Sequence, residues 1–408
     1  MTLFATFTAL VFAYSLVSKR LERTVVTAPL LFTATGAALA LLPNALADIA
    51  LDREGLLLVA ELGLVMTLFT DASRVSLTLL SARPRLPVRL LTTGMLLTIV
   101  LGAACAMVVP GGLSWAEAGI LAAILAPTDA GLGLVIVTSP LVPQRIREAL
   151  NVEAGLNDGL SVPFLMFFIA LATAGDEGGL GRVLARFLVE QLGYGTLIGL
   201  AVGFAGGSLL AFARDRKWMG EAQTQFGVVS LPLACLLASE ATGASMFIAA
   251  FVAGLAAQAG YRDVGRHSVE FTESWGQIFN YFVFFLFGLL VARDFALFDA
   301  KVIAYAVLSL TLVRMLPVAL AVRGTGLAGS TIAFMGWFGP RGLASIVLGL
   351  VYLEGNAGLQ GETTIRLAVM ATVLASIVFH GVSAKPGIER YARVLTRLPA
   401  DCPERRPP

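Results

Sequence analysis

Charge is what this sequence has least of. Only 14% of its 408 residues are Asp, Glu, Lys or Arg, whereas a soluble domain carries roughly 25%. Hydrophobic residues make up 57% of the chain, and the mean hydropathy is +0.83. A soluble core cannot bury that much apolar surface, but a lipid bilayer can. We therefore expect an all-α polytopic protein that is integral to a membrane.

Cysteine and histidine are also scarce, with three cysteines and two histidines in the chain. Cys105 and Cys235 lie in apolar runs, Cys402 lies near the C-terminus, and no pair of them has the spacing of a disulfide framework or a metal site. The net charge of +2 identifies no partner. We expect no cofactor and no nucleic-acid partner.

Long apolar runs are abundant, and each span needs about 20 mostly apolar residues. The sequence predicts about thirteen transmembrane helices, at residues 2–18, 25–43, 55–72, 88–109, 115–138, 147–173, 186–212, 223–240, 244–260, 272–292, 299–322, 328–353 and 364–383. The ninth range is short, so a count of twelve stays open. The basic tail that follows, residues 385–408, is too short to fold alone.

Basic residues alternate from one predicted loop to the next, which predicts the orientation. If the first loop, with Lys19, Arg20 and Arg23, lies in the cytoplasm, the inner loops and the tail hold 21 basic residues and the outer loops hold 6. If one helix were miscounted, the later loops would change sides and the uneven distribution of basic residues would be lost. We therefore expect the N-terminus outside and the C-terminus in the cytoplasm, in a membrane that we take to be a bacterial inner (plasma) membrane.

Two predicted helices, the fifth and the twelfth, contain helix-breaking residues near their middle. Pro127 interrupts the fifth, and Gly339 with Pro340 interrupts the twelfth, because proline lacks an N–H donor and clashes with the preceding turn. Non-helical backbone at membrane depth is tolerated only where it lines a cavity or is buried in protein. The fifth and twelfth helices are seven apart, so they cross the membrane in opposite directions, and we predict that the two halves of the chain are inverted repeats. A pair of interrupted helices in corresponding positions indicates the binding site of a secondary transporter.

Ionisable residues inside apolar spans are costly and suggest function. They are Glu61, Asp71, Asp129, Glu153, Asp158, Glu240, Arg314 and Arg341. Asp158 is the central candidate, because a carboxylate in a water-accessible cavity can hold either a proton or a cation. Oxygen ligands suit a hard cation such as Na⁺. Thr128, and with less support Asp129, are the candidate neighbours of that transported ion.

Two charged residues are expected to support the site. Glu153 and Arg341 are each expensive to bury alone, so we predict that they form a structural bridge between the sixth and twelfth helices, with Arg314 as the other possible partner of Glu153. Asp71 lies at the end of the third predicted helix. Two interpretations are equally supported: it is a polar residue at the membrane interface, or it lies on the path of the ion.

Three motifs together resemble the monovalent cation:proton antiporter superfamily, and within it the Na⁺/H⁺ exchanger branch that includes NhaP proteins. They are the Pro-Thr-Asp break at 127–129, the Glu-x-x-x-Asn-Asp-Gly segment at 153–159 and the Gly-Pro-Arg-Gly break at 339–342. The resemblance covers essentially the whole chain. It implies exchange of a monovalent cation for a proton by an elevator-like motion. By this match, Asp158 carries the ion and the proton, and the neutral Asn157 beside it implies one-for-one, electroneutral exchange.

The same resemblance implies a homodimer and a division of the chain into a core, in which the two broken helices cross at the site, and a dimerisation domain. The expected parts are dimerisation helices at 1–85, core helices at 86–175, a linker helix at 176–215, dimerisation helices at 216–295, core helices at 296–384 and the tail at 385–408. Two positions depart from the family pattern. Ala154 stands where a serine is common, and Asp71 is displaced by about one position from the usual acidic ligand.

Three other functions remain open at the level of sequence. An intramembrane aspartyl protease would use Asp129 and Asp158, but the Gly-x-Gly-Asp type of motif is absent and the paired breaks are left unexplained. A channel would need a repeated filter loop, and none is present. An organic-anion carrier would bind its substrate at the positive helix N-termini beside the breaks. Asp129 and Asp158, at the same place, favour a cation instead.

Overall fold

The computed structural model of the chain describes residues 2–21, 24–41, 53–74, 85–173, 181, 185, 187–261, 269–354, 358–399 and 402–405. Within these residues the chain forms helices, turns and loops, and no strand. The predicted all-α class is therefore confirmed.

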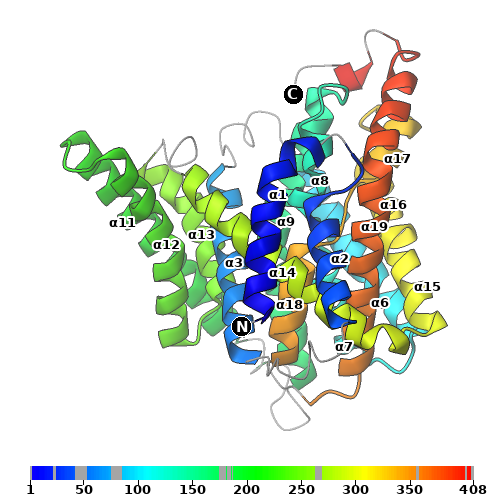
Figure 1. Ribbon diagram of the computed structural model, residues 1–408, viewed down its shortest axis with the longest axis horizontal. Helices are drawn as coiled ribbons and strands as arrows, with labels where there is room; N and C mark the ends of the chain where they lie inside the picture. The colour runs from blue at the N-terminus through cyan, green and yellow to red at the C-terminus, as the bar shows by residue number, and fades with distance from the viewer. Residues whose placement is uncertain are drawn as a thin grey trace.

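Each predicted span overlaps a helix, or two or three consecutive helical pieces, of the structure (Figure 1). The elements are α1 (Thr2–Leu21), α2 (Ala28–Ala40), α3 (Arg53–Arg74), α5 (Arg85–Arg89), the π-helical η1 (Leu90–Gly94), α6 (Met95–Val108), α7 (Trp115–Ile124), α8 (Ala130–Val137), α9 (Gln144–Thr173), the π-helical η2 (Phe187–Tyr194), α11 (Gly195–Asp215), α12 (Glu221–Thr242), α13 (Met246–Gly260), α14 (Val269–Asp294), the 3₁₀ turn η3 (Phe295–Leu297), α15 (Ala300–Leu310), α16 (Leu312–Ala321), α17 (Gly329–Trp337), α18 (Leu343–Glu354), α19 (Glu362–Leu395) and the 3₁₀ turn η4 (Pro403–Arg405).

Seven helical segments of the described chain are long and apolar enough to cross a bilayer, namely 86–108, 144–173, 187–215, 221–242, 274–297, 300–321 and 362–395. Shorter apolar helices, including α2, α7, α13 and α18, accompany them. The chain is an integral membrane protein. The count of thirteen crossings stays a prediction, because several of the helices are shorter than a full span.

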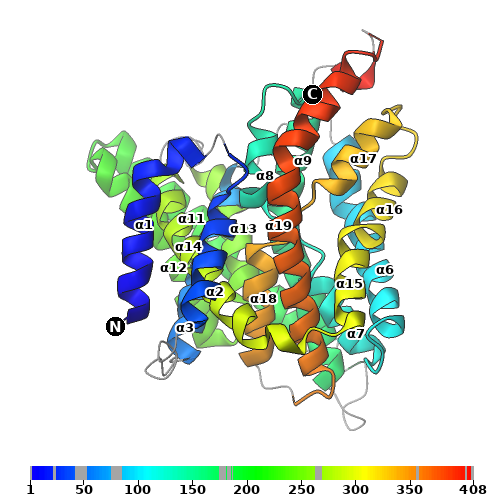
Figure 2. The ribbon, with the colours of Figure 1, turned by 45° about the vertical axis from the view of Figure 1, so that its right-hand side comes forward.

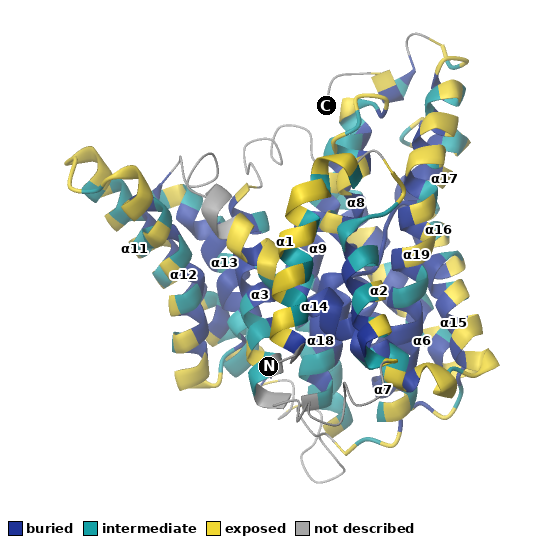
Figure 3. Ribbon diagram, in the orientation of Figure 1, coloured by how far each residue is buried: buried dark blue, intermediate teal, exposed yellow. Residues whose placement is uncertain are grey.

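The side-chain environment matches a lipid solvent. Large apolar residues on α1 and α11, among them Phe12, Leu16, Leu197 and Phe204, are exposed. Figure 3 shows exposed residues on the outer helices and buried residues along the central ones. In a bilayer, such outward-facing apolar side chains contact lipid tails instead of water.

The start of α1 and the end of α19 lie at opposite ends of the helical bundle (Figures 1 and 2). This arrangement fits an odd number of crossings. Which end faces the cytoplasm stays a prediction from the charge distribution.

The last helix is longer than the sequence predicts. α19 continues through Pro386 to Leu395, whereas the predicted tail begins at residue 385. The added turns bury Ile388, Tyr391 and Leu395, whose spacing of three and four residues places them on one helix face. Tyr391 stacks on Phe334 of α17 with ring centroids 4.3 Å apart. Packing against α17 therefore extends this helix beyond the apolar run.

Glycines allow α2 and α14 to pack with their backbones in contact. A Cβ atom added at Gly36 would lie 2.0 Å from the carbonyl oxygen of Phe285, and one added at Gly288 would lie 2.0 Å from the carbonyl oxygen of Thr33. Both distances are far below contact distance. Small residues at such positions are a usual means of close helix association in membranes.

We expect Gly36→Ala to lower the stability of the detergent-solubilised protein, because the added methyl group forces α2 away from α14. The cost should be at least about 1–3 kcal/mol, the usual range for overpacking. Thermal unfolding, followed by size-exclusion chromatography, measures this loss of stability as a lower melting temperature. Gly329→Ala is the matched control, since a Cβ at Gly329 meets no atom within 4 Å. Equal melting temperatures for the two variants would contradict the close approach of α2 and α14.

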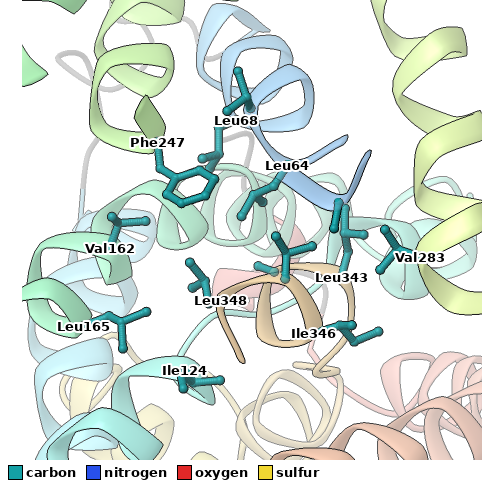
Figure 4. Packing of buried hydrophobic residues seen from close by; sticks show 14 of the residues in the cluster. Leu64, Leu68, Ile124, Val162, Leu165, Phe247, Val283, Leu343, Ile346 and Leu348 are labelled. Atoms are coloured by element: carbon teal, nitrogen blue, oxygen red, sulfur yellow. The ribbon is translucent and has the colours of Figure 1, made fainter. Parts of the chain in front are cut away.

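The second half of the twelfth predicted span, α18, lies in the apolar core. Figure 4 shows Leu343, Ile346 and Leu348 of α18 among side chains from other helices, with Leu64 and Leu68 from α3, Ile124 from α7, Val162 and Leu165 from α9 and Phe247 from α13. Every residue named here is buried. This packing fixes α18 against the helix that carries Asp158.

Candidate functional site

Both interruptions predicted from the sequence are present. Residues 125–129 separate α7 from α8, and residues 338–342 separate α17 from α18. The two non-helical segments contact each other directly, because the backbone N–H of Asp129 donates to the carbonyl oxygen of Pro340 at 2.8 Å. That the helices cross as a pair stays a prediction.

Arg341 satisfies the carbonyl groups that the first break releases. Its Nη1 donates to the carbonyl oxygens of Ala126 and Pro127, each at 2.9 Å, and the residue has no exposed surface. The hydroxyl of Ser345 donates to the carbonyl oxygen of Ile124 at 2.8 Å. A helix end leaves its last carbonyls without intrahelical partners, so Arg341 of the second break and Ser345 of α18 stabilise the first break.

Asp129 caps two helices at once. Its Oδ1 accepts from the N–H of Leu132 in α8 at 2.8 Å, and its Oδ2 accepts from the N–H of Leu343 in α18 at 2.6 Å. A carboxylate suits the positive N-terminal end of a helix. A Cβ at Gly342 would lie 2.1 Å from Asp129 Oδ2, so this double cap requires a glycine there.

Asn157 and Asp158 lie on α9 beside the breaks, and both are buried. Asn157 Nδ2 donates to Thr128 Oγ1 at 2.7 Å, which joins α9 to the first break. Oδ1 of Asn157 and Oδ1 of Asp158 are buried and find no hydrogen-bond partner among the described residues. Buried oxygens are nearly always paired, so these two acceptors on consecutive residues of α9 stand out as able to accept a hydrogen bond or to bind a cation.

Glu153 pairs with Arg314, and the predicted bridge from Glu153 to Arg341 is wrong. Arg314 Nη1 and Nη2 donate to the two carboxylate oxygens of Glu153 at 2.5 and 3.0 Å, and both side chains are only 4% exposed. Arg341 is already held by the carbonyls of the first break. Gly339 makes room for Arg314, since a Cβ there would lie 2.2 Å from Arg314 Nε.

Asp71 lies next to the helix that carries Asp158. A Cβ added at Gly155 would lie 3.6 Å from the Cβ of Asp71, and Gly155 precedes Asp158 by about one turn. The charged side chains of Asp129, Asp71 and Arg341 lie close enough to Asp158 to interact with it electrostatically. The structure therefore gathers the predicted site residues from α3, α9 and both breaks.

A narrow cleft lies between α8, α9 and the two breaks. It has a cavity volume of about 10 Å³ and is lined by Thr128, Asp129, Ala130, Gly133, Ile136, Val137, Leu150, Asn151, Glu153, Ala154, Phe338 and Pro340. That is about the room that one water molecule needs. Ala154 presents only a methyl group to this cleft.

Sequence reasoning missed the residues that hold the second break in place. Ser376 Oγ accepts from the backbone N–H of Arg341 at 2.7 Å, and His380 Nε2 lies 2.8 Å from the carbonyl oxygen of Trp337. His380 Nδ1 lies 3.1 Å from Ser376 Oγ. With the proton on Nε2, His380 donates to Trp337 and accepts from Ser376. The feature of the sequence that could have indicated this pair is their spacing of four residues, which places Ser376 and His380 on one face of α19.

The family model described as "Sodium/hydrogen exchanger, transmembrane" matches residues 6–390. This chain belongs to the sodium/hydrogen exchanger family. Similar family members include Na(+)/H(+) antiporter 2 of Zygosaccharomyces rouxii, which is 25% identical over 322 residues, or 70% of this chain and 40% of the relative. The K(+)/H(+) antiporter NhaP of Alkalimonas amylolytica is 26% identical over 337 residues, or 81% of this chain and 56% of the relative.

The exchanger-family fold is also that of a solved structure. The sodium proton antiporter MjNhaP1 from Methanocaldococcus jannaschii superposes with a TM-score of 0.74 over 96% of this chain and 99% of that chain, at 18% sequence identity. The chain spans about 40% to 62% of the length of the first curated relatives that it matches. The comparisons therefore establish the family and the fold of this chain, and they do not identify the ions that it transports.

Proposed function

We propose that this exchanger-family protein is a secondary active transporter that exchanges a monovalent cation, Na⁺ with K⁺ and Li⁺ as alternatives, for a proton across the membrane. The observation that carries the proposal is the position of Asp158. Its carboxylate is buried beside two interrupted helices, and its Oδ1 finds no hydrogen-bond donor among the described residues. Such an oxygen is available to a proton or to a cation.

Exchange requires that the two ions compete for Asp158. The carboxylate binds either a proton or a metal ion, so loading one releases the other. The unpaired Oδ1 of Asn157 and the nearby carboxylate of Asp71 offer further oxygen ligands, and a hard monovalent cation prefers oxygen. Asp129 and Thr128 flank this position from the first break.

The charge at the site supports one-for-one exchange. Asn157 is neutral, and both oxygens of Asp129 accept backbone N–H groups, so Asp158 is the carboxylate with an unpaired oxygen beside the breaks. An electroneutral cycle with elevator-type alternating access, carried out by a homodimer in a bacterial inner membrane, is our proposal for the whole protein.

Two of the three other functions, the organic-anion carrier and the aspartyl protease, lose support from the geometry of Asp129. An organic-anion carrier would bind its substrate at the N-terminal ends of α8 and α18, and the carboxylate of Asp129 already occupies both ends. An aspartyl protease would need Asp129 to share a water molecule with Asp158, whereas its two oxygens are held by Leu132 and Leu343. Neither alternative has an observation in its favour.

Reconstitution in liposomes with an internal pH dye tests the proposal. A pH gradient is imposed, Na⁺, Li⁺ or K⁺ is added in turn, and valinomycin with K⁺ clamps the potential in the Na⁺ and Li⁺ experiments. We expect cation-driven proton movement that the clamp does not change. A response to no cation would refute antiport, and a response that depends on the clamp would refute electroneutrality.

A further inference from the structure

A short C-terminal segment, residues 402–405, docks on the first turn of α17. Glu404 is only 1% exposed. Its Oε1 accepts from the backbone N–H of Ala328 at 2.7 Å and from the hydroxyl of Thr331 at 2.9 Å. The end of α19 and the turn beyond it lie at the same end of the bundle as α8 and α17 (Figures 1 and 2).

Glu404 provides a cap that α17 lacks locally. The residue at the N-cap is Ala328, which has no side-chain acceptor, although the first N–H groups of a helix need partners and favour negative charge. Burial alone would raise the pKa of Glu404, but the hydrogen bonds from Ala328 and Thr331 outweigh it and lower that pKa. The carboxylate is therefore charged at neutral pH and remains so below the ordinary pKa of a glutamate.

The same segment also contacts α9 and α19. Arg145, in the first turn of α9, donates from Nη1 to the carbonyl oxygen of Pro403 at 2.8 Å. Arg405 Nη2 donates to the carbonyl oxygen of Leu395, the last residue of α19, at 2.8 Å. Residues 402–405 thus bridge three helices that are distant in sequence, and we call this bridge the clasp.

The clasp joins two walls of the cleft. Leu150, Asn151 and Ala154 of α9 line one wall, and Phe338, directly after α17, lines another. Pro340, two residues further on, binds the backbone of Asp129. A change in the position of α17 relative to α9 would therefore alter both the width of the cleft and the break beside Asp158.

We propose that Glu404 is a positioning residue of the transport site, which acts through the clasp to set the spacing of α9 and α17. This inference rests on the proposed function. The cleft on the side of the clasp is lined by Thr128 and Asp129 of the first break, which lies beside Asp158, so the clasp sets the apparent affinity for the cation presented on that side. The affinity on the opposite side is independent of it.

The first experiment tests the clasp without transport. Cys402 is only 8% exposed, so we expect its thiol to react slowly with a maleimide in the wild type. Peptide mass spectrometry distinguishes labelling of Cys402 from labelling of Cys105 and Cys235. Glu404→Ala should speed labelling by about tenfold, as the loss of charge-assisted hydrogen bonds implies. Glu389→Ala is the matched control, since Glu389 is exposed on α19, and should leave the rate unchanged. Unchanged labelling in Glu404→Ala would overturn the clasp.

The second experiment measures the KM for the cation from each side, in vesicle preparations sorted by whether added protease reaches the C-terminal segment. Glu404→Ala should raise KM by about fivefold to tenfold on the clasp side only, with kcat little changed. Glu404→Gln, which keeps an acceptor oxygen without the charge, should give a smaller increase and guards against a misfolded alanine variant.

The outcomes separate this inference from the proposed function. Equal changes of KM on both sides, or a fall in kcat alone, would indicate general loss of structure and overturn the positioning role. Faster labelling with unchanged KM on both sides would overturn it as well. Absence of exchange in the wild type would refute the proposed function, and the labelling of Cys402 would still decide whether the clasp exists.

Discussion

Replacing Asp158 with Asn is expected to reduce cation-driven proton movement to the level of protein-free liposomes while leaving the protein folded. Asn has nearly the same shape, but it can neither take up a proton nor provide the negative charge that holds a cation. Oδ1 of Asp158 has no hydrogen-bond partner among the described residues, so the amide removes no known hydrogen bond of the fold.

Dye quenching in liposomes measures the loss, and the melting temperature of the purified variant measures folding. Asp215→Asn is the matched control, because Asp215 is exposed at the end of α11 and should keep full exchange. Exchange at the wild-type rate in Asp158→Asn would remove Asp158 from the mechanism. A variant that fails to fold would show instead that the carboxylate supports the structure.

Replacing Arg314 with Leu is expected to destabilise the protein more than any other single change to the supporting residues. It leaves the carboxylate of Glu153 buried without its bidentate partner. Removing one member of a buried ion pair typically costs about 3–5 kcal/mol, because the remaining charge is uncompensated. Thermal unfolding in detergent should show the loss directly, and Arg323→Leu, at an exposed position, is the control.

A double-mutant cycle identifies the partner of Glu153. The combined variant Glu153→Leu with Arg314→Leu should recover much of the stability lost by either change alone, since an apolar pair can replace a buried ion pair. The corresponding cycle with Arg341→Leu should show weaker coupling, because Arg341 is bound to the carbonyls of Ala126 and Pro127. Stronger coupling with Arg341 would contradict the observed pairing.

The predictable part of the site consists of features that act locally along the chain. Pro127 removes a backbone donor from its own helix, so the first break follows from one residue and its glycine neighbours. The same holds for Gly339 and Pro340. Asp158 stands out because a charge inside an apolar run is costly in any fold that crosses a membrane.

The partners of the buried charges were not predictable in the same way. Glu153 has two arginines available, Arg314 and Arg341, and the choice depends on which guanidinium lies beside it and which has other acceptors. The close approach of Arg314 to Gly339 and the carbonyls released at the first break decide it. The double cap by Asp129 depends likewise on Leu343, which is more than two hundred residues away in the chain.

The C-terminal segment shows the same limit. The sequence predicted a short basic tail at residues 385–408 that is too short to fold alone, yet Ile388, Tyr391 and Leu395 extend α19 against α17, and Glu404 is buried. One of three acidic residues in a basic segment carries no signal by itself. Its role exists because the N–H of Ala328 and the hydroxyl of Thr331 are presented at that place.

The sequence by itself determined the class of protein and the two helix breaks, and it singled out Asp158 as a candidate, because bilayer solvation and backbone chemistry act on each segment independently of its neighbours. Only the tertiary structure decided which charge pairs with which, that Asp129 joins the two breaks, and that Glu404 holds α17. Those interactions connect helices far apart in the chain, and their geometry follows from glycine contacts and packing that no single segment specifies.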